Sequence, residues 1–302
     1  MAFGKSGAGF YKAGGGGLSE VDVEVNGSAY GTATSSPFDV DVVDQNDTPV
    51  GSLSGGKWVV PDSGITDPND ITGIQLWIDG QDTSTFNGGS ITNGTGVSQW
   101  TDKSPNGFTY DQGSASSRPT FTANALGSNY GVVFDGINDF LLHSNDSEFD
   151  NDGNGTWIIV GLDGLYACFT DFGDSNDYLY MRVIVNGQFW FQGNPGNTAL
   201  SRYVSDSNGD PSNGSIYAAW YDGNYNLEID NTSVSMTATV GSNEFWYNSI
   251  NGADEMAMGR LKRSGGETYF AGTICEAIYY NRVLSSFERN LLYNYLKDKY
   301  SL

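Results

Sequence analysis

Basic residues are scarce in this sequence of 302 residues, which has 14 Lys and Arg against 36 Asp and Glu and a formal net charge of −22. So acidic a surface repels phosphate groups and argues against nucleic-acid binding and against charge attraction to an anionic membrane. We therefore expect no nucleic-acid partner. Arg182 and Arg202 are the only basic residues between Pro119 and Gly259, whereas seven of the 14 basic residues fall within residues 260–299. The middle of the chain is strongly acidic, which suits cation binding or solubility.

Long apolar runs are also missing. No stretch of 18 apolar residues occurs, so we expect no transmembrane helix and no membrane insertion. Residues 1–17 have no apolar core, so we do not expect a secretory signal. Cysteine is nearly absent, and Cys168 and Cys275 lie far apart in apolar segments. The sequence thus predicts two buried thiols rather than a disulfide framework.

Histidine occurs once, as His143. A single histidine excludes a zinc site built from several histidines, and any Ser-His-Asp triad would have to use this residue. We interpret His143 as a surface or strand-end residue.

Glycine and aromatic residues are abundant, with 41 Gly and 14% Phe, Trp and Tyr. Short apolar segments follow one another from residue 72 to residue 284, separated by Gly, Asn, Asp and Ser. Many short strands at such spacing predict an antiparallel β-sandwich or barrel. The strands do not alternate with helices, so we do not expect a parallel sheet. The predicted strands are 74–79, 97–101, 157–163, 166–172, 178–185, 188–192, 216–222, 225–230, 233–239, 255–259, 268–271 and 273–280.

The segment 130–142, YGVVFDGINDFLL, is the centre of this pattern. Its apolar residues at period-two spacing, Val132, Phe134, Phe140 and Leu142, predict two half-buried strand segments. The Asp135-Gly136 pair predicts a tight bend between them. We interpret Asp135 as an acceptor of backbone hydrogen bonds in that turn, and calcium binding by Asp135, Asn138 and Asp139 is the alternative.

One helix is expected at the end of the chain. Ser285 and Glu288 have the spacing of a capping box, and Leu291, Leu292, Tyr295 and Leu296 form an apolar face. We expect this helix to pack on the sandwich.

The first 71 residues differ in character. Residues 1–17 are a Gly-rich arm with Phe3, Phe10 and Tyr11, which is either a disordered tail or an anchor that becomes ordered against a larger partner. Residues 18–62 predict a small β-domain of about four strands, at 21–25, 38–43, 49–53 and 57–61. Residues 63–71 form a polar linker, and residues 72–302 form the sandwich.

Four patches together resemble the concanavalin A-like lectin/glucanase superfamily in its laminin-G-like branch. They are GIQLWIDGQDTSTF (73–86), VSQWTDKSPNGFTYDQGSASSRPTF (97–121), YGVVFDGINDFLL (130–142) and YFAGTICEAIYYNRVLSSFERNLLYNYLKDKY (269–300). The resemblance covers roughly residues 72–302 and implies an all-β jelly-roll sandwich of two antiparallel sheets. Such a fold does not determine function, because related sandwiches bind, catalyse or support.

The first 62 residues look like short β-modules that precede such sandwiches in tailed-phage structural proteins. The two resemblances together imply a bacteriophage virion protein, of the head-fibre, capsid-decoration or tail-fibre type. Its partners would be capsid or tail proteins that hold residues 1–62. We expect a homo-oligomer, most simply a trimer, because so small a β-domain lies near the lower size limit for an independent core.

Catalysis is not expected. Relatives with glucanase activity carry Glu-x-Asp-x-x-Glu on one strand, and the nearest match here, Glu228-Ile229-Asp230, lacks the third carboxylate. We interpret Glu228 and Asp230 as a solvated strand face. A glycoside hydrolase or depolymerase on the same fold is the alternative, and a decoration protein without sugar binding is a second one.

Calcium is the one cofactor that the sequence suggests. Residues 150–155, DNDGNG, match the first half of a calcium loop, with Asp150, Asp152 and Asn154 as oxygen ligands. The twelfth position is Gly161 instead of Glu, which excludes an EF-hand. An Asx-rich turn is the alternative.

Attachment to host glycans would use exposed aromatic rings beside amide and carboxylate groups. Two loops have that composition, DFGDSNDY (171–178) with Trp190, and NEFWYN (243–248). The candidate residues are Asp171, Asp174, Asn176, Asp177, Tyr178, Trp190, Trp246 and Tyr247. Core tryptophans are the alternative interpretation.

Overall fold

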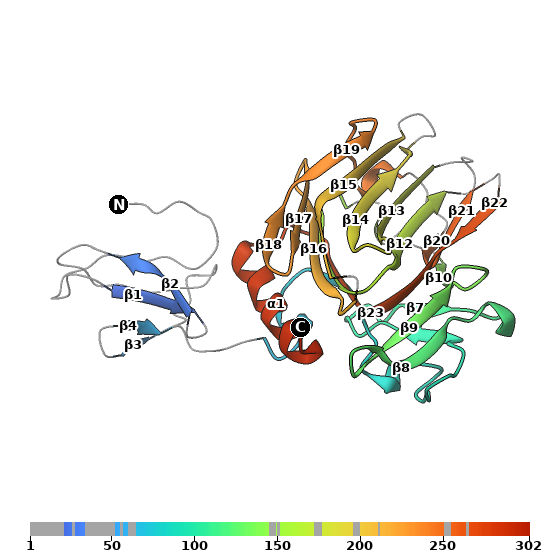
Figure 1. Cartoon of the computed structure of the whole chain (residues 1–302), viewed down its shortest axis with the longest axis horizontal. Coiled ribbons are helices and arrows are strands. Elements are labelled where there is room, and N and C mark those ends of the chain that lie inside the picture. The colour runs from blue at the N-terminus through green and yellow to red at the C-terminus, as the bar shows by residue number, and fades with distance from the viewer. Residues whose placement is uncertain are drawn as a thin grey trace. The chain divides into compact units, whose positions relative to one another are not determined.

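The structure is a computed structural model of the whole chain. It describes the strands within residues 21–25, 28–33, 52–54 and 57–59, and then residues 65–144, 149, 152–171, 177–195, 200–210, 212–250, 255–263 and 266–302 (Figure 1). Phe3, Phe10 and Tyr11 lie outside the described residues. The chain divides into two compact units, Met1–Thr66 with Ser285–Tyr295, and Asp67–Leu284 with Leu296–Leu302.

The described strands of the first unit form a four-stranded sheet in the order β2-β1-β4-β3. Its strands are β1 (Val21–Val25), β2 (Ser28–Ala33), β3 (Ser52–Ser54) and β4 (Lys57–Val59). β1 pairs with β4 in parallel, whereas the other pairs are antiparallel. The sequence did not predict β2, because SAYGTA has small residues and no apolar alternation. The strand predicted at 38–43 lies outside the described residues.

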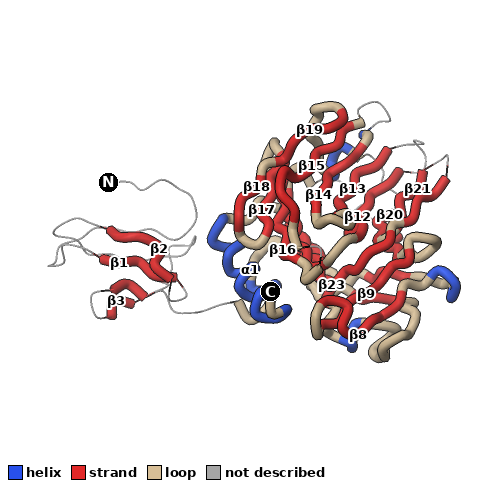
Figure 2. The backbone as a smooth tube through the Cα atoms, in the orientation of Figure 1, coloured by secondary structure: helices blue, strands red, loops and turns tan. Residues whose placement is uncertain are grey.

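The second unit is an antiparallel β-sandwich, as the strands of Figure 2 show. One described sheet has nine strands, here called the large sheet, in the order β19 (Met236–Val240), β15 (Ser201–Asn208), β14 (Gln188–Gly193), β13 (Asp177–Val183), β12 (Gly164–Asp171), β20 (Glu255–Met258), β10 (Leu141–Ser144), β7 (Thr109–Asp111) and β6 (Gln99–Thr101). The other, the small sheet, has the order β18 (Thr232–Val234), β17 (Tyr225–Ile229), β16 (Ser215–Tyr221), β11 (Gly155–Gly161), β23 (Ala271–Tyr280), β9 (Asn129–Asp135) and β8 (Thr120–Leu126), and β5 (Ile74–Asp79) also pairs with β23. β21 (Arg260–Arg263) and β22 (Gly266–Tyr269) form a hairpin. The predicted all-β sandwich with a C-terminal helix is confirmed.

Aromatic side chains fill the space between the two sheets. Trp157 from β11, Phe191 from β14 and Tyr217 from β16 are fully buried in one cluster. The Trp157 and Tyr279 rings stack with centroids 5.0 Å apart. Because each strand alternates its faces, the residues between these core positions point outward from the sandwich.

The segment 130–142 departs from the prediction in one respect. β9 belongs to the small sheet and β10 to the large sheet, so the turn between them crosses from one layer to the other. Leu141 is fully buried, whereas Phe140 and Leu142 are half-buried, so the alternation in β10 has the opposite phase. The apolar pattern could not show this change of phase. When the chain crosses to the other sheet, the pairing of the new strand decides which of its residues face the core.

The turn itself has the predicted geometry. The Asp135 Oδ1 atom accepts the backbone N–H groups of Ile137, Asn138 and Asp139 at 2.7, 3.2 and 3.3 Å. Gly136 has a φ of +73°, which only glycine adopts readily. The interpretation of Asp135 as a turn residue is confirmed.

The Trp-x-Asp-x-Ser pattern at 100–104 also has a structural role. Asp102 is buried, and its Oδ1 atom accepts the N–H groups of Trp77 at 2.6 Å and of Ser104 at 2.7 Å. The pKa of Asp102 is raised, because the effect of burial exceeds that of these hydrogen bonds, which lower it. The motif thus joins the start of the sandwich to the loop after β6.

The helix α1 (Ser286–Tyr300) begins with the predicted capping box. Glu288 Oε2 accepts the Ser285 N–H at 2.8 Å, and Ser285 Oγ accepts the Glu288 N–H at 3.3 Å. Its last turn packs on the sandwich as predicted, because the Tyr300 hydroxyl donates to the Cys275 carbonyl at 3.1 Å. No helix among the described residues is long and apolar enough to cross a membrane.

Candidate functional site

The outward face of the large sheet carries a set of polar and aromatic side chains. In β13, Leu179, Met181 and Val183 enter the core, so alternation directs Tyr178, Tyr180 and Arg182 outward. In β14, Phe189 and Phe191 enter the core, and Trp190 and Gln192 point outward. We call the set Tyr178, Arg182, Trp190, Gln192 and Arg202 the arginine–tryptophan face.

Two arginines flank the Trp190 ring on this face. Arg182 lies directly opposite Trp190 across the β13–β14 ladder, and Arg202 lies opposite Gln192 on β15. The guanidinium carbons of Arg182 and Arg202 are 5.5 and 4.6 Å from the Trp190 ring centroid. At such distances the negative face of an indole ring attracts a cation.

Hydrogen bonds hold the rest of the face in position. Arg202 Nε donates to Gln192 Oε1 at 2.6 Å, and Gln192 Nε2 donates to the Tyr178 hydroxyl at 3.1 Å. Trp190 Nε1 donates to Gln188 Oε1 at 2.9 Å. These bonds restrict the side chains before any ligand arrives, which lowers the entropy cost of binding.

Aromatic rings hold Arg182 without a carboxylate. Its guanidinium carbon is 4.6 Å from the Phe270 ring centroid. Its Nε atom is buried and has no hydrogen-bond partner among the described residues. Burial lowers the pKa of Arg182, because the charged form loses hydration.

Beside this arginine lies a small apolar cluster outside the main core. The rings of Tyr178 and Tyr180 stack at 5.9 Å with an interplanar angle of 9°, and both pack with Leu261 and Phe270. Tyr178 is therefore buried, and it contributes its hydroxyl to the face instead of an exposed ring.

The other predicted glycan residues have different positions. Trp246 and Tyr247 are 0% and 1% exposed, and Trp246 Nε1 donates to the Tyr279 hydroxyl at 3.2 Å. The prediction that they form an exposed loop is wrong, because the chain turns these two rings into the aromatic core. Asp177 is buried, while Asp174, Asn176 and the side chain of Asp171 lie outside the described residues.

The predicted calcium loop is described only in part. Asp152 is half-buried, its Oδ2 atom accepts the Tyr279 hydroxyl at 2.8 Å, and burial raises the pKa of its carboxyl group. Asn154 is exposed, and Asp150 lies outside the described residues. Within the described part of the chain, no group of three or more His, Cys, Asp or Glu residues could hold a metal ion.

The two carboxylates nearest to the glucanase motif do not share a strand face. Glu228 lies in β17, but Asp230 lies in the turn after it, where Asp230 and Asn231 have φ values of +49° and +60°. Asp230 Oδ1 accepts the Ile216 N–H at 2.9 Å. The interpretation of both residues as a strand face is corrected for Asp230, since two positive φ values make the tight hairpin turn.

His143 lies at the end of β10 and is half-buried, as expected for a strand-end histidine. Its Nδ1 atom is 3.1 Å from the Thr109 carbonyl oxygen, and its ring lies 4.7 Å from that of Phe108. The Nδ1 contact is to a backbone carbonyl, whereas a catalytic triad would place a carboxylate there.

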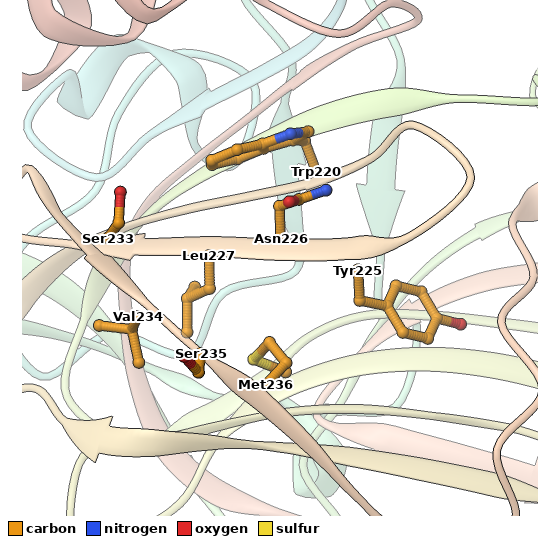
Figure 3. Close-up of a pocket in the computed structure, with 8 residues that line it drawn as sticks. All are labelled: Trp220, Tyr225, Asn226, Leu227, Ser233, Val234, Ser235 and Met236. Carbon is orange, nitrogen blue, oxygen red and sulfur yellow. The ribbon is translucent and has the colours of Figure 1, made fainter.

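A pocket of about 400 Å³ lies where the chain leaves β18 for β19. Figure 3 shows Trp220 and Asn226 on one side of β17, with Leu227, Val234 and Met236 on the other. None of the lining residues is a carboxylate, a histidine, a lysine or an arginine, and the pKa of Tyr225, the one titratable lining residue, is raised by burial. We therefore take the arginine–tryptophan face as the candidate site.

No protein-family model matches this chain, and no curated protein matches it. Several solved structures are similar in fold. The CBM40 of Ruminococcus gnavus IT-sialidase, bound to α2,3 sialyllactose, is 17% identical with a TM-score of 0.39 over 48% of this chain and 84% of that chain. The binding domain of botulinum neurotoxin DC, in complex with rat synaptotagmin II, is 12% identical with a TM-score of 0.48 over 76% of this chain and 52% of that chain. A Trypanosoma rangeli sialidase is 11% identical with a TM-score of 0.49 over 80% of this chain and 36% of that chain. At such low identities and TM-scores, none of these similarities assigns a function to this chain.

The sequence prediction included Trp190 and Tyr178 but omitted both arginines. Their isolation within an acidic stretch was visible, as was the outward phase of Arg182 in YLYMRV. The coincidence of these two facts indicates the arginines: the only two basic residues of that stretch lie on or beside the strands that carry Trp190 and Tyr178.

Proposed function

We propose that this chain is a virion structural protein whose sandwich binds host-surface glycans through the arginine–tryptophan face. The single observation that carries the glycan part is the half-buried Trp190 ring, which has two arginines beside it on the outward face of the large sheet. An indole ring offers an apolar surface to a sugar ring, and neighbouring amides and guanidinium groups orient its hydroxyls.

The virion part of the proposal rests on the sequence. A Gly-rich arm, a small β-domain and a lectin-like sandwich follow one another, and the first 62 residues would attach to capsid or tail proteins. Deletion of residues 1–20 should abolish incorporation into particles, while the isolated protein keeps its far-UV circular dichroism and its melting temperature. A truncated chain that still enters particles would contradict the anchor.

Self-association, most simply as a trimer, belongs to the same proposal. The outermost described strand of the large sheet, β19, exposes residues 237–240 and contains no charged residue. Uncharged exposed edges are favourable sites for pairing with a further chain. Light scattering of the purified protein tests this, and a monomer at every concentration would contradict it.

Calcium at the loop 150–154 remains a proposal. Calcium should raise the melting temperature of the wild type, magnesium at the same concentration should not, and Asp150→Asn should remove the effect. An equal response of wild type and variant would reject the site.

The sugar-binding part is tested on a glycan array with wild type and Trp190→Ala. Loss of the ring should remove the signal, because the variant loses the stacking surface. The matched control is Tyr130→Ala, which removes an aromatic ring that is 36% exposed on β9 of the small sheet. An unchanged array for Trp190→Ala, or an equal loss in the control, would contradict the proposed face.

Hydrolysis is not part of the proposal. The carboxylate of Asp230 already accepts a backbone N–H and lies outside the strand of Glu228. If the wild type released reducing ends from a polysaccharide and Glu228→Gln did not, the protein would be a glycan hydrolase and the proposed binding function would be wrong.

A further inference from the structure

The charge of the arginine–tryptophan face is opposite to that of its surroundings. Residues 120–258 contain 18 Asp and Glu but only two basic residues, Arg182 and Arg202. Both basic side chains lie against one indole ring. The single cationic spot in this acidic stretch therefore coincides with the proposed sugar-stacking surface.

Neither arginine is occupied by an internal carboxylate. Lys103, Arg260 and Lys299 form ion pairs with carboxylates, whereas no ion pair between described residues involves Arg182 or Arg202. Arg202 donates a hydrogen bond to the uncharged side chain of Gln192, which in turn donates to the Tyr178 hydroxyl. The two charges are thus placed by rings and amides, and their remaining donors are available to an external anion.

Arginine suits one particular anion geometry. The planar guanidinium presents parallel N–H groups that match both oxygens of a carboxylate. Arg182 has given up part of its hydration between Trp190 and Phe270, and its charge interacts with Asp163 only beyond ion-pair distance, which makes a bound anion more favourable there.

The wider charge distribution limits the size of that anion. With a net charge of −22, the protein repels polyanions as a whole, but screening confines such repulsion to roughly 8 Å at physiological ionic strength. A single carboxylate next to two guanidinium groups feels attraction at contact and little of the distant repulsion. A densely sulfated chain extends beyond the face and meets the acidic surface.

We propose that the face selects acidic sugars, namely pyranose units that carry one carboxylate, with the sugar ring on Trp190 and the carboxylate at Arg182 and Arg202. This inference rests on the proposed glycan-binding function and goes further by stating the chemical class of the ligand. It assigns a role to both arginines, which general glycan binding does not require.

The probes are sialyllactose and oligogalacturonate, each compared with its carboxyl-reduced neutral form. Calorimetric titration of the full chain should show binding to at least one acidic probe that is ten-fold or more tighter than to its reduced form. A higher salt concentration should lower the affinity for the acidic probe and leave the affinity for the neutral probe nearly unchanged. Heparin should bind more weakly than the preferred acidic probe.

Arg182→Gln and Arg202→Gln should each reduce the preference for the carboxylate at least five-fold while residual binding to the neutral probe persists. Arg182→Lys should keep more of the preference than Arg182→Gln but less than the wild type, because an ammonium group cannot donate two parallel hydrogen bonds to one carboxylate. The control is Lys297→Gln, which removes the same charge from an exposed position in α1 and should change nothing. Melting curves establish that each variant is folded.

The outcomes separate the two proposals. Equal affinity of the wild type for acidic and reduced probes, or tighter binding to heparin, overturns the acidic-sugar inference and leaves glycan binding intact. Lack of binding to every glycan on the array overturns the proposed function and the inference with it. An unaltered preference in both folded arginine variants also rejects the inference.

Discussion

Lys299 and Glu276 form a buried ion pair, in which the Lys299 Nζ atom donates to Glu276 Oε2 over 2.6 Å. Glu276 is 0% exposed in the middle of β23, and Lys299 lies in the last turn of α1. Trp77 Nε1 donates to the other carboxylate oxygen at 2.7 Å, and the Tyr300 hydroxyl donates to Oε2 at 2.8 Å. Lys299 also contacts Asp79 at 2.8 Å. The pair thus joins the end of the helix to the sandwich.

Lys299→Met should destabilise the protein strongly. The substitution leaves the Glu276 carboxylate buried without its cation, which typically costs about 3–5 kcal/mol. Urea unfolding at pH 8 measures the change. Lys297→Met, in the same turn but exposed, is the control and should stay within about 0.5 kcal/mol of the wild type. Equal effects of the two substitutions would show that the ion pair contributes nothing specific.

The same pair predicts a dependence of stability on pH. Burial raises the pKa of Glu276 to about 7 from its ordinary 4.5, although Lys299 counteracts the rise. Between these values the folded state keeps a proton that the unfolded state releases, so this group's contribution is full below pH 4.5 and is lost as pH rises through 7.

Glu276→Gln cannot titrate and should therefore gain stability relative to the wild type between pH 4.5 and pH 8, on the order of 3 kcal/mol. Melting temperatures of both proteins across this range give the difference. A constant difference would mean that Glu276 stays ionised in the folded state throughout.

Trp246 and Trp190 should differ in what their loss affects. Trp246→Ala removes a fully buried ring from the core and should cost about 3–5 kcal/mol of unfolding free energy. Trp190→Ala removes a half-buried ring outside the core and should cost less, while it abolishes glycan binding. Denaturation curves and array signals of both variants test this. Loss of binding in folded Trp246→Ala with retention in Trp190→Ala would reverse the assignment.

Gly136→Ala should destabilise more than Gly107→Ala. Both glycines have positive φ values, +73° and +63°, so both substitutions strain the backbone by about 1–2 kcal/mol. A Cβ atom at Gly136 would lie 2.7 Å from the Ala271 backbone nitrogen, whereas one at Gly107 meets nothing within 4 Å. The difference between the two melting temperatures reports this contact, and equal losses would exclude it.

Most strands of the sandwich could be predicted from short runs of large apolar residues, as in β11, β16 and β23, which are buried on both faces. The sequence did not predict β7, β8, β15 and β21. β8 contains Asn124 at a φ of +57°, and β15 places only Tyr203 as a large core residue among Ser, Asp and Asn. The strand predicted at 233–239 is two strands in different sheets, β18 and β19, which separate at Ser235. Alternation continues through such a crossing, so the pattern cannot reveal it.

The candidate site was predictable only in part. Trp190 could be identified as a glycan residue, but nothing in the sequence distinguished it from Trp246, which lies in the core. Composition describes which residues a loop contains, while burial depends on which way the chain turns after the strand. The two arginines meet Trp190 through the register of β13, β14 and β15, and register depends on loops and bulges that the apolar pattern does not encode.

The sequence by itself determined the all-β class, the C-terminal helix with its cap, the turn at Asp135 and the acidic charge. Each of these depends on neighbouring residues or on composition, so local chemistry is sufficient. Only the tertiary structure decided that Arg182, Trp190 and Arg202 share one face and that Glu276 meets Lys299. Both arrangements join residues on separate elements, and the distances between these residues depend on strand pairing and packing. Neighbouring residues in the sequence do not determine that pairing.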